Sequence, residues 1–192
     1  MEIKKKGYIL KVDKDISFNP NPRDDNNLGT MYCFHRRYRL GDETEIKDPG
    51  RFNDWLQENK ERIVCKLPLY LYDHSGICMA TTDFNDPWDS GKVGFIVCTK
   101  DDIERWNNKN LSVENIEKIL KQEVQDYSDY LEGKHTYYYF SIKDDEYKVI
   151  DSCSGFKYEN LKDMLNEMKG YADEQFGYLF DDLLKKENQN YL

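Results

Sequence analysis

Residues 67–95 constrain the fold more than any other stretch, because three short apolar runs alternate there with polar segments. In the first run, residues 67–72, leucine occupies every second position, which is the pattern of a strand with one buried face. A polar turn leads to a second run at 77–82, and an acidic loop leads to a third at 93–98. The stretch therefore predicts a β-hairpin followed by another strand, joined by acidic, histidine-bearing loops.

The rest of the chain contains further strand patterns and several amphipathic helices. Strands are expected at residues 7–12, 31–40, 135–142 and 147–151, and helices at 48–59, 99–106, 112–133 and 159–184. Hairpin-linked strands that helices interrupt or follow predict an α+β fold, with a mainly antiparallel sheet of about five to seven strands and three to four helices packed on it. We expect one domain over residues 1–192, with a frayed tail at 185–192.

The charge balance bears on the partners that the chain can bind. Of its 192 residues, 37 are acidic and 28 are basic, which gives a net charge of −9. An acidic surface repels phosphate backbones and argues against non-specific nucleic-acid binding. The same charge can serve solubility alone, or it can let the protein occupy the basic channel of a nucleic-acid enzyme.

The cysteines and the apolar runs indicate a compartment. The five cysteines are odd in number and widely spaced, and no CxxC pair occurs, which favours reduced thiols over a disulfide framework. The segment 1–6, which has lysines at 4–6, is not followed by the apolar segment of a signal peptide, and no apolar run is long enough to span a bilayer. We expect an intracellular, cytoplasmic protein with no membrane partner.

Residues 35–39 carry three arginines and one histidine, and they form a dense basic cluster in this acidic chain. Two interpretations of the cluster stay open. The arginines can pair with carboxylates of the chain itself, or they can bind an anion such as phosphate, since guanidinium groups fit its oxygens in a bidentate way. We assign His35, Arg36 and Arg37 to a candidate binding surface.

Three segments with Asp, Ser and Gly, at residues 73–76, 89–91 and 151–155, each join or leave a predicted strand. Asx turns closed by glycine explain them structurally. If they gather at one end of the sheet, they form a polar pocket. A site for a divalent metal ion or a hydrolytic reaction would then use Asp73, His74 and Asp89, and a nucleophilic thiol would be Cys153, which we place in an exposed turn.

None of the common catalytic signatures, such as a Walker loop, GxGxxG, HExxH or GxSxG, occurs in the chain. We therefore assign no catalytic residue and no cofactor in the leading interpretation, and the divalent metal ion stays an alternative.

Several segments resemble a known group of sequences. They are GTM at 29–31, HRRY at 35–38, LPLYLYDHSG at 67–76, PWDSG at 87–91, VGFI at 93–96, and DSC with GF at 151–156. Together they are similar to a family of uncharacterised proteins encoded by phages, prophages and plasmids of Gram-positive bacteria, over residues 21–156. The resemblance implies no activity; it implies that the protein belongs to a mobile element.

These observations lead to one functional hypothesis and two alternatives. We expect an accessory protein that inhibits a host defence system, such as a CRISPR or restriction nuclease, by stoichiometric binding. Its acidic, aromatic surface would comprise Tyr72, Asp83, Asp86, Trp88 and Asp89. The alternatives are a metal-dependent hydrolase or nuclease that acts on nucleic acid or a nucleotide, and a nucleotide-binding sponge without chemistry. The sequence leaves the oligomeric state open.

Overall fold

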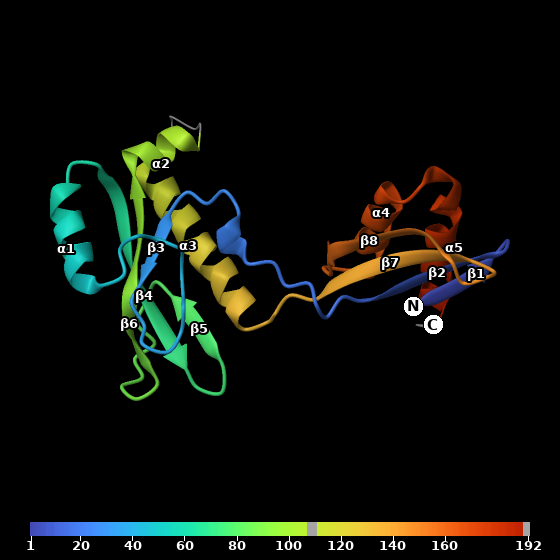
Figure 1. Cartoon of the computed structure of the whole chain (residues 1–192), viewed down its shortest axis with the longest axis horizontal. Helices are drawn as coiled ribbons and strands as arrows, with labels where there is room; N and C mark the ends of the chain where they lie inside the picture. The colour runs from blue at the N-terminus through green and yellow to red at the C-terminus, as the bar shows by residue number, and fades with distance from the viewer. Residues whose placement is uncertain (107–110, 190–192) are drawn as a thin grey trace. The chain divides into compact units, whose positions relative to one another are not determined.

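The computed structural model describes residues 1–106 and 111–189. It has an α+β fold in which eight antiparallel strands form two four-stranded sheets. The chain divides into two compact units. We call residues 1–19 together with 135–192 the terminal unit, and residues 20–134 the central unit; each has its own sheet, helices and core (Figure 1).

The terminal unit packs its helices on one face of a sheet with the strand order β1-β2-β7-β8. Leu10 and Val12 lie two residues apart along β2, so both point to the same face. Phe140 of β7 packs edge-on against Phe180 of α5, at 5.3 Å between ring centroids. The elements are β1 (Glu2–Lys5), β2 (Tyr8–Lys14), β7 (Tyr137–Asp144), β8 (Val149–Lys157), α4 (Leu161–Tyr171), η2 (Glu174–Phe176) and α5 (Gly177–Gln189).

The central unit contains the stretch that dominated the sequence analysis. Its sheet has the strand order β3-β6-β4-β5. The elements are η1 (Pro22–Asp24), β3 (Thr30–Cys33), α1 (Pro49–Glu58), β4 (Ile63–Asp73), β5 (Ile77–Ala80), β6 (Ser90–Thr99), α2 (Lys100–Arg105) and α3 (Val113–Leu131). The hairpin and the third strand expected at residues 67–98 correspond to β4, β5 and β6.

Helices cover both faces of the central sheet. Met31 of β3 and Ile96 of β6 are paired and fully buried in the core that α3 closes. The next pair, Tyr32 and Phe95, points to the opposite face and packs on Phe52 of α1, at 4.8 and 5.6 Å between ring centroids. Figure 1 shows α1 and α3 on opposite sides of this sheet.

The helix starts follow the local signals of the sequence. The side chain of Asp48 caps α1 with Pro49 as the first helical residue, and Ser112 caps α3. Thr99 and Asp102 form a reciprocal capping box at the start of α2. These three helices were predicted at their observed positions.

The structure differs from the expected architecture in how the strands are grouped. The α+β class and the antiparallel pairing are confirmed, but the strands form two sheets of four rather than one sheet of five to seven. The reason is that β2 pairs with β7, far along the chain, and the whole central unit lies between them in sequence. The expectation of one domain over residues 1–192 stays a prediction.

Three segments also differ from the sequence-based expectation. The strand expected at 31–40 ends at Cys33, because the ring of His35 accepts the N–H groups of Arg37 and Tyr38 and turns the chain. Residues 151–155 are part of strand β8 and not a turn. Helix α5 continues to Gln189, so residues 185–189 are helical rather than frayed, and residues 190–192 lie outside the described residues.

Among the residues that the structure describes, none of the helices combines the length and the apolar character needed to cross a bilayer.

Candidate functional site

The turn after β4 and the loop before β6 lie together at one end of the central sheet. The backbone N–H of Asp73 donates to the carbonyl of Asp89 at 2.8 Å. The Nδ1 atom of His74 lies 2.7 Å from Oδ2 of Asp89. The strand register places Tyr72 opposite Ser90, directly before these contacts. Two of the three polar segments found in the sequence therefore adjoin; the third lies in the terminal unit.

Asp73 joins this pair of turns to the basic segment after β3. Its carboxylate accepts a hydrogen bond from Nη2 of Arg37 at 2.6 Å and lies 3.2 Å from the hydroxyl of Tyr38. Arg37 thus pairs with a carboxylate of the chain itself, which was the first of the two interpretations of the basic cluster.

The loop at residues 83–89, which we call the Trp88 loop, is ordered by its own carboxylates. Oδ1 of Asp86 accepts the N–H groups of Trp88 and Asp89, both at 2.9 Å, and Oδ1 of Asp83 accepts the N–H of Asn85 at 2.9 Å. The bonds from Asp89 and Trp88 lower the pKa of the Asp86 carboxyl. Within this fixed backbone, the Trp88 side chain is 91% exposed.

Aromatic contacts support the base of the Trp88 loop. The ring of Tyr72 stacks on that of His74, with 6.1 Å between ring centroids, and packs on Phe84 at 5.5 Å. Trp88 has no ring partner among the described residues. The role of these residues as a binding site stays a prediction.

The alternative metal site would need several ligands around one point. Asp73, His74 and Asp89 come together, but within residues 1–106 and 111–189 no group of three or more His, Cys, Asp or Glu side chains is placed to hold a metal ion. The carboxylate of Asp73 is engaged by Arg37 and Tyr38, and that of Asp89 by His74.

Four of the five cysteines lack the surroundings of a reactive thiolate, and the fifth, Cys153, does not lie where the sequence suggested. Cys153 lies on β8, partly buried against the core of the terminal unit, and not in the exposed turn that the sequence suggested. Burial raises the pKa of Cys33 and of Cys98 to about 12, and it also raises the pKa of Cys65 and Cys78. Neutral thiols are poor nucleophiles.

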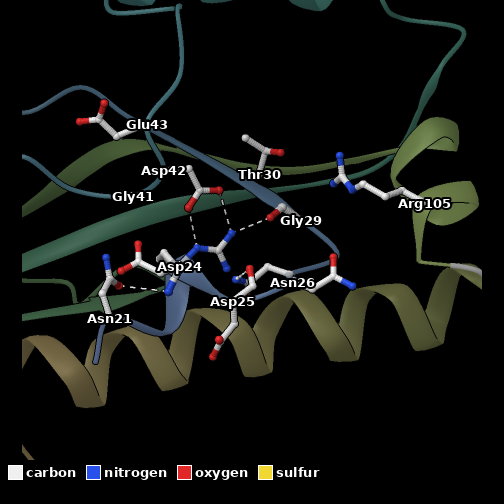
Figure 2. A pocket seen from close by; sticks show the side chains of 12 residues that line it. Asn21, Asp24, Asp25, Asn26, Gly29, Thr30, Gly41, Asp42, Glu43 and Arg105 are labelled. Atoms are coloured by element: carbon white, nitrogen blue, oxygen red, sulfur yellow. Dashed lines mark hydrogen bonds and ion pairs between the residues drawn. The ribbon is translucent and has the colours of Figure 1, made fainter. Parts of the chain in front are cut away.

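The sequence analysis missed a buried charge network in the central unit (Figure 2). Arg23 donates to the two carboxylate oxygens of Asp42 at 2.7 and 2.8 Å, to the carbonyl of Gly29 at 2.6 Å and to Glu123 at 3.1 Å. Figure 2 shows Asp42 and Gly29 turned toward this guanidinium group, in a pocket of about 490 Å³, while Glu43 and Arg105 lie away from it.

The network holds the loop before β3 against α3. Glu123 accepts the backbone N–H groups of Leu28 at 2.6 Å and Gly29 at 3.2 Å, and Asp42 accepts that of Met31 at 2.9 Å. Burial raises the pKa of the Glu123 carboxyl, and the bonds from Leu28 and Arg23 oppose this effect. Each charge is satisfied by partners within the unit, so the network has a structural role.

One signal of this network was present in the sequence. Glu123 lies three residues after Leu120 and four before Tyr127, on the stripe of α3 that faces the sheet. A carboxylate on a buried stripe requires a cationic or hydrogen-bonding partner. The sequence alone does not show that this partner is Arg23.

No family model, no curated protein and no solved structure matches this chain.

Proposed function

We propose that this protein is a mobile-element accessory protein that inhibits a host defence nuclease, of the CRISPR or restriction type, by stoichiometric binding in the cytoplasm. The binding surface is the Trp88 loop with the neighbouring Tyr72. The partner is a nucleic-acid enzyme with a basic substrate groove. The observation that carries the proposal is the exposed Trp88 side chain on a loop that the chain itself orders.

Trp88 supports a protein partner because of its size and its fixed position. Tryptophan is enriched among the residues that contribute most to binding at protein interfaces. A loop that is already ordered loses little conformational entropy on binding. Asp86 fixes the backbone at Trp88 through two N–H bonds, so the anchor is presented before any partner arrives.

The charge of the loop supports a basic partner. Residues 83–89 carry three carboxylates, at Asp83, Asp86 and Asp89, and no basic side chain. Asp83 and Asp86 each use Oδ1 to order the loop, and among the described residues their Oδ2 atoms take part in no hydrogen bond or ion pair. An acidic loop of this kind complements a groove that binds a phosphate backbone. The resemblance to phage-encoded proteins supports the mobile-element setting.

The test is inhibition of DNA cleavage by a panel of CRISPR and restriction nucleases. We expect cleavage by the target to fall in proportion to the molar ratio of inhibitor to nuclease and inhibition to weaken as salt rises. Trp88→Ala should weaken inhibition at least tenfold. Inhibition at strongly substoichiometric protein would contradict the binding mechanism.

A matched control separates the Trp88 loop from exposed aromatic surface in general. Tyr171 of α4 is 68% exposed and lies in the terminal unit, so Tyr171→Ala should leave inhibition unchanged. An equal loss in both variants would contradict the assignment of the binding surface to the Trp88 loop.

A second candidate function is hydrolysis of nucleic acid or a nucleotide, and the contact between His74 and Asp89 favours it. A carboxylate 2.7 Å from one ring nitrogen orients an imidazole so that the other nitrogen can act as a general base. Multiple-turnover hydrolysis that His74→Ala abolishes, with the fold retained by circular dichroism, would select this function over inhibition by binding.

A further inference from the structure

A second cavity of the central unit lies between the segment after β3 and the C-terminal part of α3. Its volume is about 940 Å³, and all the residues that line it belong to the central unit. Ligand pockets in proteins usually measure about 300 to 1,000 Å³, so a small organic molecule fits this space. The walls are joined where the backbone N–H of Gly41 donates to the hydroxyl of Tyr127 at 3.0 Å.

Two arginines line this cavity, and neither forms an ion pair among the described residues. The chain has seven arginines. Five of them form ion pairs with carboxylates: Arg23, Arg37, Arg51, Arg62 and Arg105. Arg36 and Arg39 form none within the described residues, and both line the cavity.

This arrangement is informative because the chain has an excess of carboxylates. With 37 acidic against 28 basic residues, partners for a guanidinium group are abundant. Lys47 also lines the cavity without an ion pair among the described residues. Of the acidic lining residues, Asp42 is neutralised by Arg23, which leaves Glu43. The cavity is therefore locally positive and suited to the oxygens of a phosphate group.

Planar side chains lie beside these cations. The ring of His35 stacks on Tyr38 at 5.0 Å with an interplanar angle of 10°, and Tyr127 stacks on Tyr130 at 5.9 Å and 18°. All four line the cavity. Nδ1 of His35 accepts two backbone N–H groups, so its neutral ring carries the proton on Nε2, where it can donate.

We propose that this cavity binds a nucleotide. Arg36 and Arg39 contact the phosphate oxygens, with Lys47 adding charge, and the base stacks on the half-buried ring of Tyr130. The combination of cationic and planar side chains selects a ligand that has both phosphate and an aromatic base. The site uses none of the residues of the Trp88 loop, so it stands independently of the proposed inhibitor function.

The test is isothermal titration calorimetry, in which the full chain is titrated with ATP, GTP, CTP, UTP and, separately, inorganic triphosphate. We expect at least one nucleoside triphosphate to bind once per chain, more tightly than triphosphate, with an affinity that falls as salt rises. Arg36→Ala/Arg39→Ala should weaken this binding at least tenfold, while Tyr130→Ala should weaken nucleotide binding and leave triphosphate binding unchanged.

Two controls make the outcome decisive. Arg62→Ala/Lys118→Ala removes the same charge from exposed ion pairs outside the cavity and should leave binding unchanged, as should Trp88→Ala. Arg36→Lys/Arg39→Lys keeps the charge and should retain part of the affinity. No saturable binding at millimolar nucleotide, binding that survives Arg36→Ala/Arg39→Ala, or triphosphate bound as tightly as every nucleotide would each overturn the proposal.

Discussion

Arg23 and Arg37 both pair with carboxylates, but the Arg23 side chain is buried and the Arg37 side chain is exposed. The Arg23 side chain is 2% exposed and neutralises two carboxylates that the fold has removed from water. The Arg37 side chain is 71% exposed, and its pair with Asp73 competes with solvent. Because removal of one partner from a buried ion pair leaves an uncompensated charge, the two arginines should differ strongly in their contribution to stability.

We expect Arg23→Met to lower the free energy of unfolding by about 3–5 kcal/mol, since Asp42 and Glu123 then lose their cation. Arg37→Ala should change it by less than about 1 kcal/mol. Urea denaturation followed by circular dichroism measures both values. Equal effects of the two substitutions would show that the Arg23 network does not stabilise the central unit.

The thiols give a second prediction at this scale. Cys98 is fully buried, and burial raises its pKa to about 12. At pH 8 the fraction of this side chain in the thiolate form is therefore on the order of a thousandfold smaller than for an ordinary cysteine. Alkylation by iodoacetamide should therefore be slow at Cys98 in the native protein, and raising the pH from 8 to 10 should leave it largely unreacted. Mass spectrometry of the labelled peptides measures this.

The control for this experiment is the unfolded chain, in which all five cysteines should react at similar rates. Rapid labelling of Cys98 under native conditions would mean that β6 opens readily to solvent.

At the scale of elements, β6 is an inner strand of the central sheet, because it pairs with both β3 and β4. The close approach of β3 depends on Gly94. A Cβ atom at this position would lie 1.8 Å from the carbonyl oxygen of Tyr32. Another glycine of the same strand, Gly91, has open space where its Cβ would be. Close packing of β3 therefore requires glycine at position 94 and does not require it at position 91.

We expect Gly94→Ala to destabilise the protein by about 1–3 kcal/mol, because the backbone of β3 must move away. Hydrogen exchange of residues 30–33 should accelerate in this variant. Gly91→Ala, with no neighbour to displace, should leave both stability and exchange close to those of the wild type. A Gly94→Ala variant as stable as Gly91→Ala would contradict the close packing of β3 on β6.

At the scale of the whole molecule, the two units have separate cores. Every residue of one buried cluster lies in the terminal unit, and every residue of the other lies in the central unit. The central unit is one continuous segment that is inserted between β2 and β7, which pair with each other. A continuous unit with its own core, whose flanking strands pair with each other, is expected to fold without the rest of the chain.

We expect residues 20–134, expressed alone, to give a cooperative urea transition and a near-ultraviolet circular dichroism spectrum typical of packed aromatic rings. A companion chain in which a short Gly/Ser linker joins Asn19 to His135 should fold as the terminal unit. If residues 20–134 remain unfolded in isolation, the two units form one folding domain, as the sequence suggested.

The candidate site was partly accessible from the sequence. The polar segments around His74 and Asp89 were identified as neighbours of strands, and a hairpin with a third strand brings them to one end of a sheet. The segment around Cys153 looked similar, yet it lies within β8. Short Asp-Ser-Gly segments occur in turns and in strands alike, so composition did not separate the two cases.

By itself the sequence determined what depends on near neighbours. Asp48 before Pro49 set the start of α1, Ser112 set that of α3, and the alternation at residues 67–72 set β4, because capping and side-chain periodicity act over a few residues. Only the tertiary structure decided which strands share a sheet, that Arg23 neutralises Glu123, and that Arg36 and Arg39 line a cavity without an ion pair among the described residues. These features depend on contacts between residues far apart along the chain, for which local sequence carries no signal.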